Sequence, residues 1–146
     1  MEKLVKTLGE LEAETARFVS ELVPKEDEAT LVTLSGDLGA GKTAFTKATA
    51  LSLGVMETVN SPTFVLEKIY SLESKNSKFK RLIHIDAYRL VSGSDLAPLG
   101  FDELMQDSGN LILLEWPEKV ADALPEPAVK ISISLCPDES RTISYD

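Results

Sequence analysis

The sequence predicts an α/β fold in which a central mixed β-sheet is flanked by helices and carries β-hairpin insertions. Three observations lead to this prediction. Residues 36–43 match the pattern G-x-x-x-x-G-K-[ST] at every fixed position. A short aliphatic and β-branched run, residues 29–34, precedes them and predicts a buried strand. Residues 42–53 contain no Gly or Pro and predict a helix that stops at Gly54.

The glycine-rich loop is a candidate nucleotide site. Its glycines let the backbone N–H groups point inward and cradle a polyphosphate, and the N-terminal end of the following helix adds positive potential. Lys42 can reach the β and γ phosphates, and the Thr43 hydroxyl can ligate the Mg²⁺ that accompanies them. The residues expected to contact nucleotide are Gly36, Asp37, Leu38, Gly39, Ala40, Gly41, Lys42 and Thr43. The prediction is therefore a phosphate-loop (P-loop) NTPase-like domain that binds a nucleoside triphosphate with Mg²⁺.

Length and composition indicate one soluble domain over residues 1–146. The net charge of −9 argues against broad, direct binding to nucleic acid or to an anionic membrane. Cys136 is the only cysteine, which leaves no partner for an intrachain disulfide and favours a reducing compartment. No signal-peptide region or stretch long enough to span a bilayer is present, so a cytoplasmic location is expected.

The N-terminal elements follow from local patterns. Residues 3–8 predict a short edge strand, and Thr7 with Glu10 predicts a capping box at the start of a helix, with Thr7 or a near neighbour as the N-cap. One stripe of this helix is expected to be buried, and the opposite stripe, including Glu14, is expected to face solvent. The N-terminal end of this helix could lie against a nucleotide base.

A β-hairpin is expected after the P-loop helix, with strands at residues 63–72 and 81–90 and a solvated basic tip at Lys75, Lys78, Lys80 and Arg81. Thr63 follows Pro62, which prevents a regular helix there. Two interpretations of Thr63 stay open. It begins the strand, or it lies in a switch loop that senses the metal and the γ-phosphate.

Two predicted strands end in a carboxylate. Asp86 ends the apolar run that contains His84, and Glu115 ends an aliphatic run at residues 110–114. Either carboxylate could hold Mg²⁺ or its water shell, or could cap the next element. His84 is interpreted as a core residue rather than a ligand, and Trp116 as core or as a lid beside the nucleotide.

The remaining elements are short. Ser94 and Asp95 are expected to cap two helical turns that reach residue 105. Residues 117–124 predict a short helix with proline at its first position. Residues 129–135 and 141–145 predict a closing hairpin.

Three classes of P-loop protein are candidates. A guanine-specific switch needs an Asn-Lys-x-Asp base reader, and the nearest string, at residues 76–79, lacks the Asp. A small-molecule kinase needs an acceptor pocket and usually an arginine-bearing lid, yet the chain has only four arginines and no segment that resembles a lid. This kinase is the alternative. The favoured class is a small ATPase whose hydrolysis drives a partner protein.

The residues 36–43, Ser61-Pro62-Thr63, His84-x-Asp86-x-Tyr88-Arg89 and Glu115-Trp116 together resemble the bacterial TsaE family over nearly the whole chain. The resemblance implies an ATPase required, with TsaB and TsaD, for threonylcarbamoyl modification of the adenosine next to the anticodon of tRNA. It also implies that ATP hydrolysis resets the complex. Turnover by the isolated chain should be slow and stimulated by the partners, and tRNA should be reached only indirectly, through the complex.

The resemblance also implies roles for single residues. Lys42 would hold the phosphates, and Thr43 would ligate Mg²⁺. Glu115 would be the second carboxylate on the metal side, and Asp86 would help to position metal or water. Thr63 would be the switch-like threonine, and Trp116 an aromatic side chain near the nucleotide. Which of the two carboxylates ligates Mg²⁺ directly, and which residue activates water, stays open.

Overall fold

The computed structural model describes residues 1–37, 39–55, 66–72 and 78–146. In this part of the chain, seven strands form one sheet in the order β1-β7-β6-β2-β5-β4-β3. The strands are β1 (Glu2–Val5), β2 (Thr30–Ser35), β3 (Glu67–Ser71), β4 (Arg81–Asp86), β5 (Asn110–Glu115), β6 (Val129–Leu135) and β7 (Arg141–Tyr145). The helices are α1 (Leu8–Glu21), α2 (Lys42–Ser52) and α3 (Phe101–Met105), with short 3₁₀ helices η1 (Gly93–Leu99), η2 (Pro117–Lys119) and η3 (Ala121–Ala123).

The sheet is mixed, as predicted. Strands β6, β2, β5 and β4 run parallel, and β7 and β3 run antiparallel to them on either side. Strand β1 pairs antiparallel with β7 at one edge of the sheet. Strand β2 lies in the centre and is buried along nearly its whole length, which explains its unbroken aliphatic and threonine sequence. The predicted hairpins are confirmed: β3 pairs with β4, and β6 pairs with β7.

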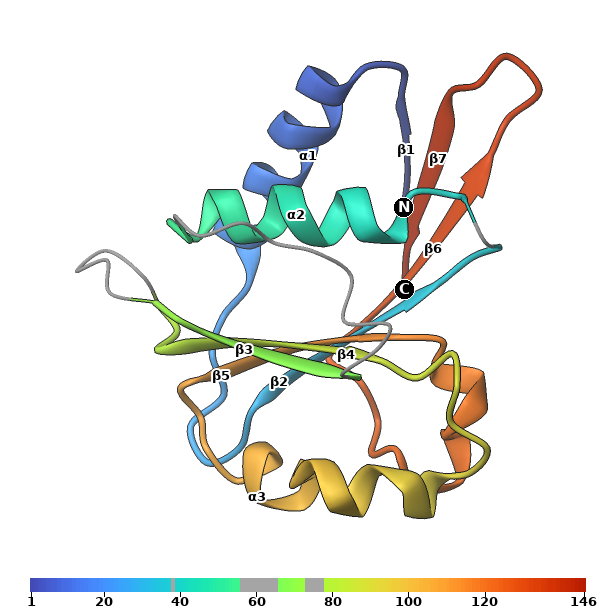
Figure 1. Cartoon of the computed structure of the whole chain (residues 1–146). Coiled ribbons are helices and arrows are strands. Elements are labelled where there is room, and N and C mark those ends of the chain that lie inside the picture. The colour runs from blue at the N-terminus through green and yellow to red at the C-terminus, as the bar shows by residue number, and fades with distance from the viewer. Residues whose placement is uncertain (38, 56–65, 73–77) are drawn as a thin grey trace.

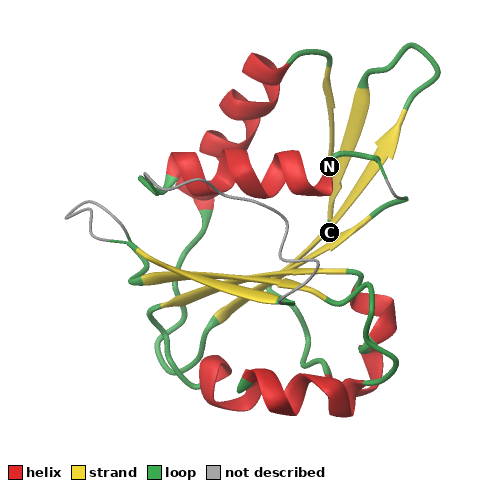
Figure 2. Cartoon of the chain, viewed as in Figure 1, coloured by secondary structure: helices red, strands yellow, loops and turns green. Residues whose placement is uncertain are grey.

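Helices cover both faces of the sheet (Figure 1). Helices α1 and α2 lie on one face, and η1 and α3 lie on the other, as the colouring by secondary structure also shows (Figure 2). Because side chains alternate along a strand, β4 and β5 supply both layers. Leu82 and Leu113 join the core under α1 and α2, while Ile83 and Leu114 join the core over η1 and α3.

Helix α1 begins as predicted and differs from the prediction along its side. Thr7 is the N-cap, and its Oγ1 accepts a hydrogen bond from Glu10 N at 3.1 Å. The Glu10 carboxylate accepts from Lys6 N at 2.5 Å, one residue before the cap. The prediction that Glu14 faces solvent is wrong, because β7 packs beside this side of the helix and Glu14 is only 8% exposed.

Glu14 has strong partners in this position. Tyr145 Oη donates to it at 2.5 Å, and Arg17 Nη2 forms an ion pair with it at 2.6 Å. Burial alone would raise the pKa of Glu14, but the hydrogen bonds from Arg17 and Tyr145 outweigh burial and hold the pKa below its ordinary value. The hydrogen bond between Tyr145 and Glu14 therefore links α1 to β7, the last strand of the chain.

Two strand and loop predictions need correction. The strand predicted to run to residue 90 ends at Asp86, because the chain turns there and Tyr88 N bonds the Asp86 side chain. The basic tip is not simply solvated. Lys78 donates to two carbonyls at the end of α1, at 2.6 and 2.9 Å, and Arg81 forms an ion pair with Asp107.

The connections after β4 are close to expectation. The two expected helical turns are η1 and α3, although the N-cap is Ser92 rather than Ser94, with Asp95 closing the capping box. The helix predicted over residues 117–124 is two 3₁₀ turns, η2 and η3, with Pro117 at its first position. In the described part of the chain, no helix combines the length and the apolar character that crossing a bilayer requires.

Candidate functional site

The candidate site lies at the edge of the sheet where the parallel strands β2, β4 and β5 end. The residues that follow β2 form the P-loop, and α2 begins directly after it. Strand register places Asp86 beside Glu115, and Glu115 beside Leu34 of β2. Carboxyl ends of parallel strands meet at one edge of a sheet, which is where open α/β sheets bind ligands. The topology therefore gathers the P-loop and both predicted carboxylates.

Two P-loop glycines are required by the backbone. Gly36 has φ +151°, and a Cβ added there would lie 2.5 Å from the carbonyl oxygen of Ile133 in β6. Gly41 has φ +112° and is the N-cap of α2, and an added Cβ would lie 3.1 Å from Arg141 Nε. Only glycine fits both positions without displacing a neighbour. The loop is thus packed tightly between β6 and the start of β7.

Lys42 is held inside this loop. Its side chain is buried, and Nζ donates to the carbonyl oxygens of Gly36 and, at 3.1 Å, of Asp37. Nζ also lies 4.0 Å from the centre of the Trp116 ring, a cation–π distance. Burial lowers the pKa of Lys42, and the nearby charge of Glu115 acts in the opposite direction.

The two strand-end carboxylates are buried and are held in different ways. Asp86 is 6% exposed and Glu115 is 3% exposed. Asp86 Oδ1 accepts from Tyr88 N at 3.0 Å, within the turn that ends β4. Glu115 Oε2 contacts Nε2 of His84, which is fully buried. His84 is therefore a core residue, as predicted, and also a direct neighbour of a candidate site residue.

Trp116 stands beside the loop in an unusual backbone conformation. Its φ of 60° and ψ of 53° are left-handed, which is uncommon for a bulky residue and is found where the surrounding structure demands it. Its N–H bonds Leu34 O at 3.2 Å, and its ring lies 5.0 Å from that of Tyr88. The aromatic side chain is fixed next to Lys42 of the P-loop.

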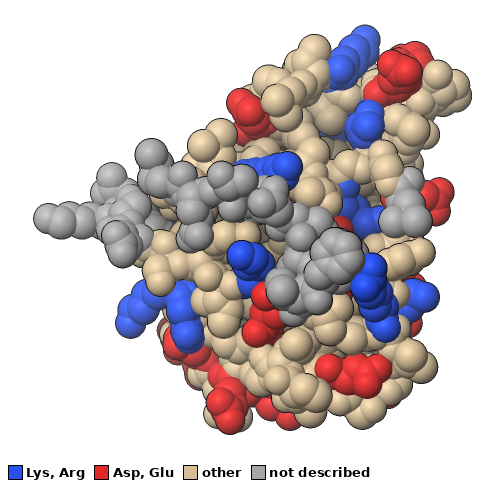
Figure 3. Space-filling view, in the orientation of Figure 1, with Lys and Arg blue, Asp and Glu red and all other residues tan. Residues whose placement is uncertain are grey.

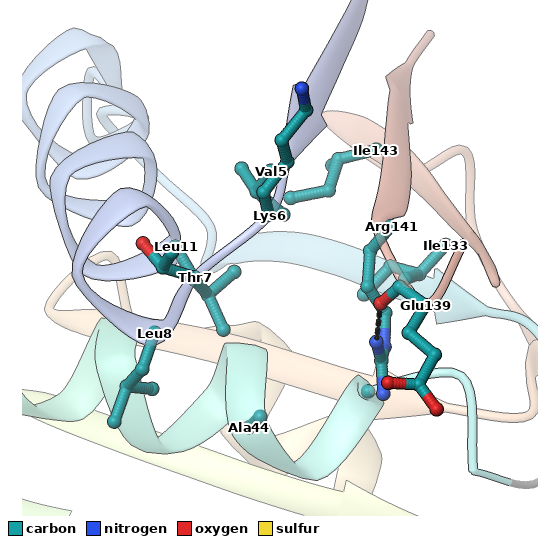
Figure 4. Close-up of a pocket in the computed structure, with 11 residues that line it drawn as sticks. Val5, Lys6, Thr7, Leu8, Leu11, Ala44, Ile133, Glu139, Arg141 and Ile143 are labelled. Carbon is teal, nitrogen blue, oxygen red and sulfur yellow. Dashed lines mark hydrogen bonds between the residues drawn. The ribbon is translucent and has the colours of Figure 1, made fainter. Parts of the chain in front are cut away.

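A cavity of about 220 Å³ borders the P-loop at Gly41, and Figure 4 shows residues that line it. Its walls come from the end of β1, the start of α1, the first turn of α2 and strands β6 and β7; they include Thr7, Leu11, Ala44, Ile133 and Arg141. Arg141 Nη1 donates to Glu139 O at 2.8 Å (Figure 4). Arg141 was not among the residues predicted for the site. No local motif marks it, because only the pairing of β6 and β7 brings it to the P-loop.

The structure brings together most of the predicted site. The described P-loop residues, Asp86, Glu115 and Trp116 lie at the same sheet edge, and Thr43 lies in the first turn of α2. Leu38 and Thr63 lie outside the described residues. Within the described ranges, no group of three or more His, Cys, Asp or Glu side chains is placed to hold a metal ion. One hydroxyl and two carboxylates fit Mg²⁺, which proteins bind through one or two carboxylates together with substrate phosphates.

The fold and the site together indicate which class of protein this chain belongs to. A strand, a glycine-rich loop and a helix carry a buried lysine at the carboxyl edge of a parallel sheet, and the phosphate-loop nucleotide-binding proteins share this arrangement. The comparisons with known proteins identify the family. The model of the family described as "Threonylcarbamoyl adenosine biosynthesis protein TsaE" matches residues 10–143. The chain therefore belongs to the TsaE family, and its role lies in tRNA threonylcarbamoyladenosine biosynthesis.

Several relatives support this assignment. A tRNA threonylcarbamoyladenosine biosynthesis protein TsaE from Treponema pallidum is 38% identical over 131 residues, which cover 90% of this chain and 92% of that protein. The Bacillus subtilis TsaE protein is 40% identical over 115 residues, which cover 79% of this chain and 68% of that protein. The crystal structure of Bacillus subtilis YdiB superposes with a TM-score of 0.74 at 28% identity, covering 99% of this chain and 83% of that one. The resemblance seen in the sequence is confirmed.

Proposed function

We propose that this chain binds ATP with Mg²⁺ at the P-loop and hydrolyses it, with the whole chain acting as one ATPase domain. The observation that carries the proposal is the shared position of three buried charged side chains, Lys42, Asp86 and Glu115, at one sheet edge. Buried charges are costly unless they are paired or serve a ligand. A polyphosphate with its metal ion would give Lys42 an anion to bind and would give the two carboxylates a cation to hold.

The lysine is suited to an anionic ligand. Without one, its ammonium group bonds two loop carbonyls and an aromatic face, and burial lowers its pKa. Bound β and γ phosphates would replace those carbonyl contacts with charge-assisted hydrogen bonds, which are about twice as strong as neutral ones. The gain is realised only when the phosphates are present, so Lys42 supports binding of a triphosphate or diphosphate.

The cavity beside the P-loop fits the base of the nucleotide. It is lined mainly by apolar side chains, with Thr7 and Arg141 among the polar residues (Figure 4). Gly41 of the P-loop also borders it. A planar base would bury its faces against Leu11 and Ile133, while its ribose would lie toward the loop. The N-terminal end of α1 would then lie against the base.

The metal would be held by oxygen atoms. We assign the Thr43 hydroxyl and the carboxylates of Glu115 and Asp86 to Mg²⁺ or to its water shell, with phosphate oxygens completing the coordination. Mg²⁺ would supply charge neutralisation at the phosphates. Thr63 is assigned to the same region as a switch-like residue. The chain's own contribution is to hold these donors and to keep the site away from bulk water.

The partners in this proposal are TsaB and TsaD, and hydrolysis by this chain would reset their assembly between modification cycles. The net charge of −9 agrees with contact to tRNA only through the complex. On the face shown in Figure 3, basic side chains along the middle are interspersed with acidic ones, and acidic side chains gather toward the layer of η1 and α3. Turnover by the isolated chain would be slow.

The test measures ADP release and modified adenosine in one mixture. The chain is incubated with ATP, Mg²⁺ and a tRNA transcript, with and without the TsaB and TsaD pair. We expect slow ADP release alone, faster release with the pair, and modified adenosine only in the full mixture. Equal ADP release with and without the pair would contradict partner stimulation. Transfer of phosphate to a small acceptor would indicate the kinase alternative.

Two variants assign the residues. Lys42→Ala should lose nucleotide affinity and modification together, whereas Lys47→Ala, an exposed lysine on the same helix, should retain both. Glu115→Ala should keep much of its nucleotide affinity while hydrolysis collapses. Glu103→Ala, at an exposed position of α3 on the opposite face of the sheet, is the control for Glu115 and should retain hydrolysis. Parental hydrolysis in Glu115→Ala would remove Glu115 from the mechanism.

A further inference from the structure

His84 and Glu115 form a buried polar contact between two central strands. His84 is the only histidine in the sequence, and it is fully buried in β4. Register pairs His84 with Leu113 and Asp86 with Glu115, so the contact between His84 Nε2 and Glu115 Oε2 runs diagonally across the strands. Diagonal neighbours on one face of a sheet are within reach of long side chains. Both side chains therefore lie on the face covered by α2, at the level of the P-loop.

The contact determines which imidazole nitrogen carries the proton. An ionised carboxylate only accepts hydrogen bonds, so His84 Nε2 must donate to Glu115. The other nitrogen, Nδ1, is buried, and no described residue offers it a hydrogen-bond partner. If the proton were on Nδ1 instead, this buried N–H would have no acceptor among the described residues. The lone pair of Nε2 would then also face a lone pair of Glu115 Oε2, and both effects are costly. The arrangement therefore assigns the Nε2–H form.

We propose that His84 is a positioning residue for Glu115. Its Nε2–H holds one carboxylate oxygen, so that the other faces the metal side of the P-loop. The inference rests on the proposed function, in which Glu115 serves Mg²⁺ bound with the nucleotide. Carboxylates that ligate metals depend on such outer partners, and removing one costs about 10–100-fold in metal affinity or activity.

The surroundings favour this role over simple strand packing. The neighbours of His84 on the same face of the sheet include Leu82 and Leu113, which are fully buried and apolar. A leucine would fit such a layer, whereas histidine adds a polar atom that finds a partner only in Glu115. Asp86, the other carboxylate, is held by the backbone N–H of Tyr88 instead. Each carboxylate at the site thus has its own positioning donor.

The first experiment separates metal binding from nucleotide binding. His84→Leu removes the donor, and His84→Gln retains an N–H near the Nε2 position. Calorimetry measures ADP affinity in EDTA and then as Mg²⁺ is titrated. We expect metal-free ADP affinity close to that of the parent in both variants. Mg²⁺ should raise ADP affinity, and the midpoint is the Mg²⁺ concentration at which half of this increase is reached. This midpoint should be about 10–100-fold higher in His84→Leu than in the parent. In His84→Gln it should return toward the parental value.

Two results of this experiment would overturn the proposal. One is parental Mg²⁺ dependence in a folded His84→Leu chain, and the other is an equal loss of ADP affinity with and without metal. If His84→Leu does not fold, His84→Asn replaces it. Its shorter amide reaches only the Nδ1 position, so it should show the loss that His84→Gln avoids. Equal Mg²⁺ dependence in these two amide variants would also overturn the proposal.

A second measurement does not need nucleotide. With a single histidine, a ¹⁵N-histidine-labelled chain gives one set of imidazole signals in two-bond ¹⁵N–¹H correlation spectra, which distinguish the two neutral forms. We expect the Nε2–H form, with signals that move in Glu115→Gln. An Nδ1–H form would refute the proposal. A parent that binds no ADP under any condition would instead refute the proposed function, while these spectra would still decide the contact.

Discussion

Replacing Gly36 by alanine should disrupt the junction between β2 and the P-loop. At φ +151° a side chain is strained, and strain of this kind costs about 1–3 kcal/mol. The new Cβ would lie 2.5 Å from the carbonyl oxygen of Ile133 in β6, closer by about 0.5 Å than real Cβ contacts allow. That oxygen belongs to a central strand, so relieving the overlap must shift backbone, at a further cost of about 1–3 kcal/mol.

Gly39→Ala is the matched control in the same loop. Gly39 has φ +82°, and an added Cβ would meet nothing within 4 Å. Its cost is therefore backbone strain alone, about 1–2 kcal/mol. The free energy of unfolding, measured by urea titration with circular dichroism, should fall by about 2–6 kcal/mol in Gly36→Ala. It should fall clearly less in Gly39→Ala.

The same variants should differ in nucleotide binding. A backbone shift at Gly36 moves the amides that are expected to cradle phosphate, and MgADP affinity should fall by about tenfold or more. Calorimetry checks this value. Unfolding free energies that are equal in the two variants would refute the reasoning, because the contact with Ile133 O is the only steric difference invoked between them.

Three further predictions concern Trp116, Tyr145 and Lys78. Trp116 is the only tryptophan in the sequence, and its ring lies 4.0 Å from Lys42 Nζ. Its fluorescence should therefore change as ADP draws the ammonium group away. In Lys42→Met, measured at ADP concentrations that saturate the variant, this change should be lost, and a parental response there would contradict the prediction. Tyr145→Phe removes a donor to Glu14, whose pKa the fold lowers, so unfolding free energy should drop by about 1–3 kcal/mol at pH 7. A carboxyl group whose pKa is lowered in the folded state contributes its full stabilisation only above its ordinary pKa of 4.5. The difference in unfolding free energy between the parent and Tyr145→Phe should therefore shrink as the pH falls below 4.5. A difference that stays constant with pH would contradict the lowered pKa of Glu14. Lys78→Met removes two hydrogen bonds to carbonyls at the end of α1 and should lower unfolding free energy by about 0.5–1.5 kcal/mol, measured in urea; no change would show that the contact contributes nothing.

Local patterns in the sequence were enough for much of the fold and for the centre of the site. The strands predicted at residues 129–135 and 141–145 have the same bounds in the structure, because alternating side chains and a turn sequence specify a hairpin locally. The P-loop pattern located Lys42, and the run before each carboxylate located Asp86 and Glu115 at strand ends. These features depend on neighbours within a few residues.

Other features of the site depend on strand order and packing, which local patterns do not encode. Arg141 lies beside Gly41 only because β7 pairs with β6, next to β2. Glu14 is buried because β7 supplies Tyr145, a residue 131 positions away. In each case the sequence determined the residue and its local conformation. The tertiary structure decided its partner, because contacts between distant segments are set by how the sheet is ordered and by what must be paired once it is buried.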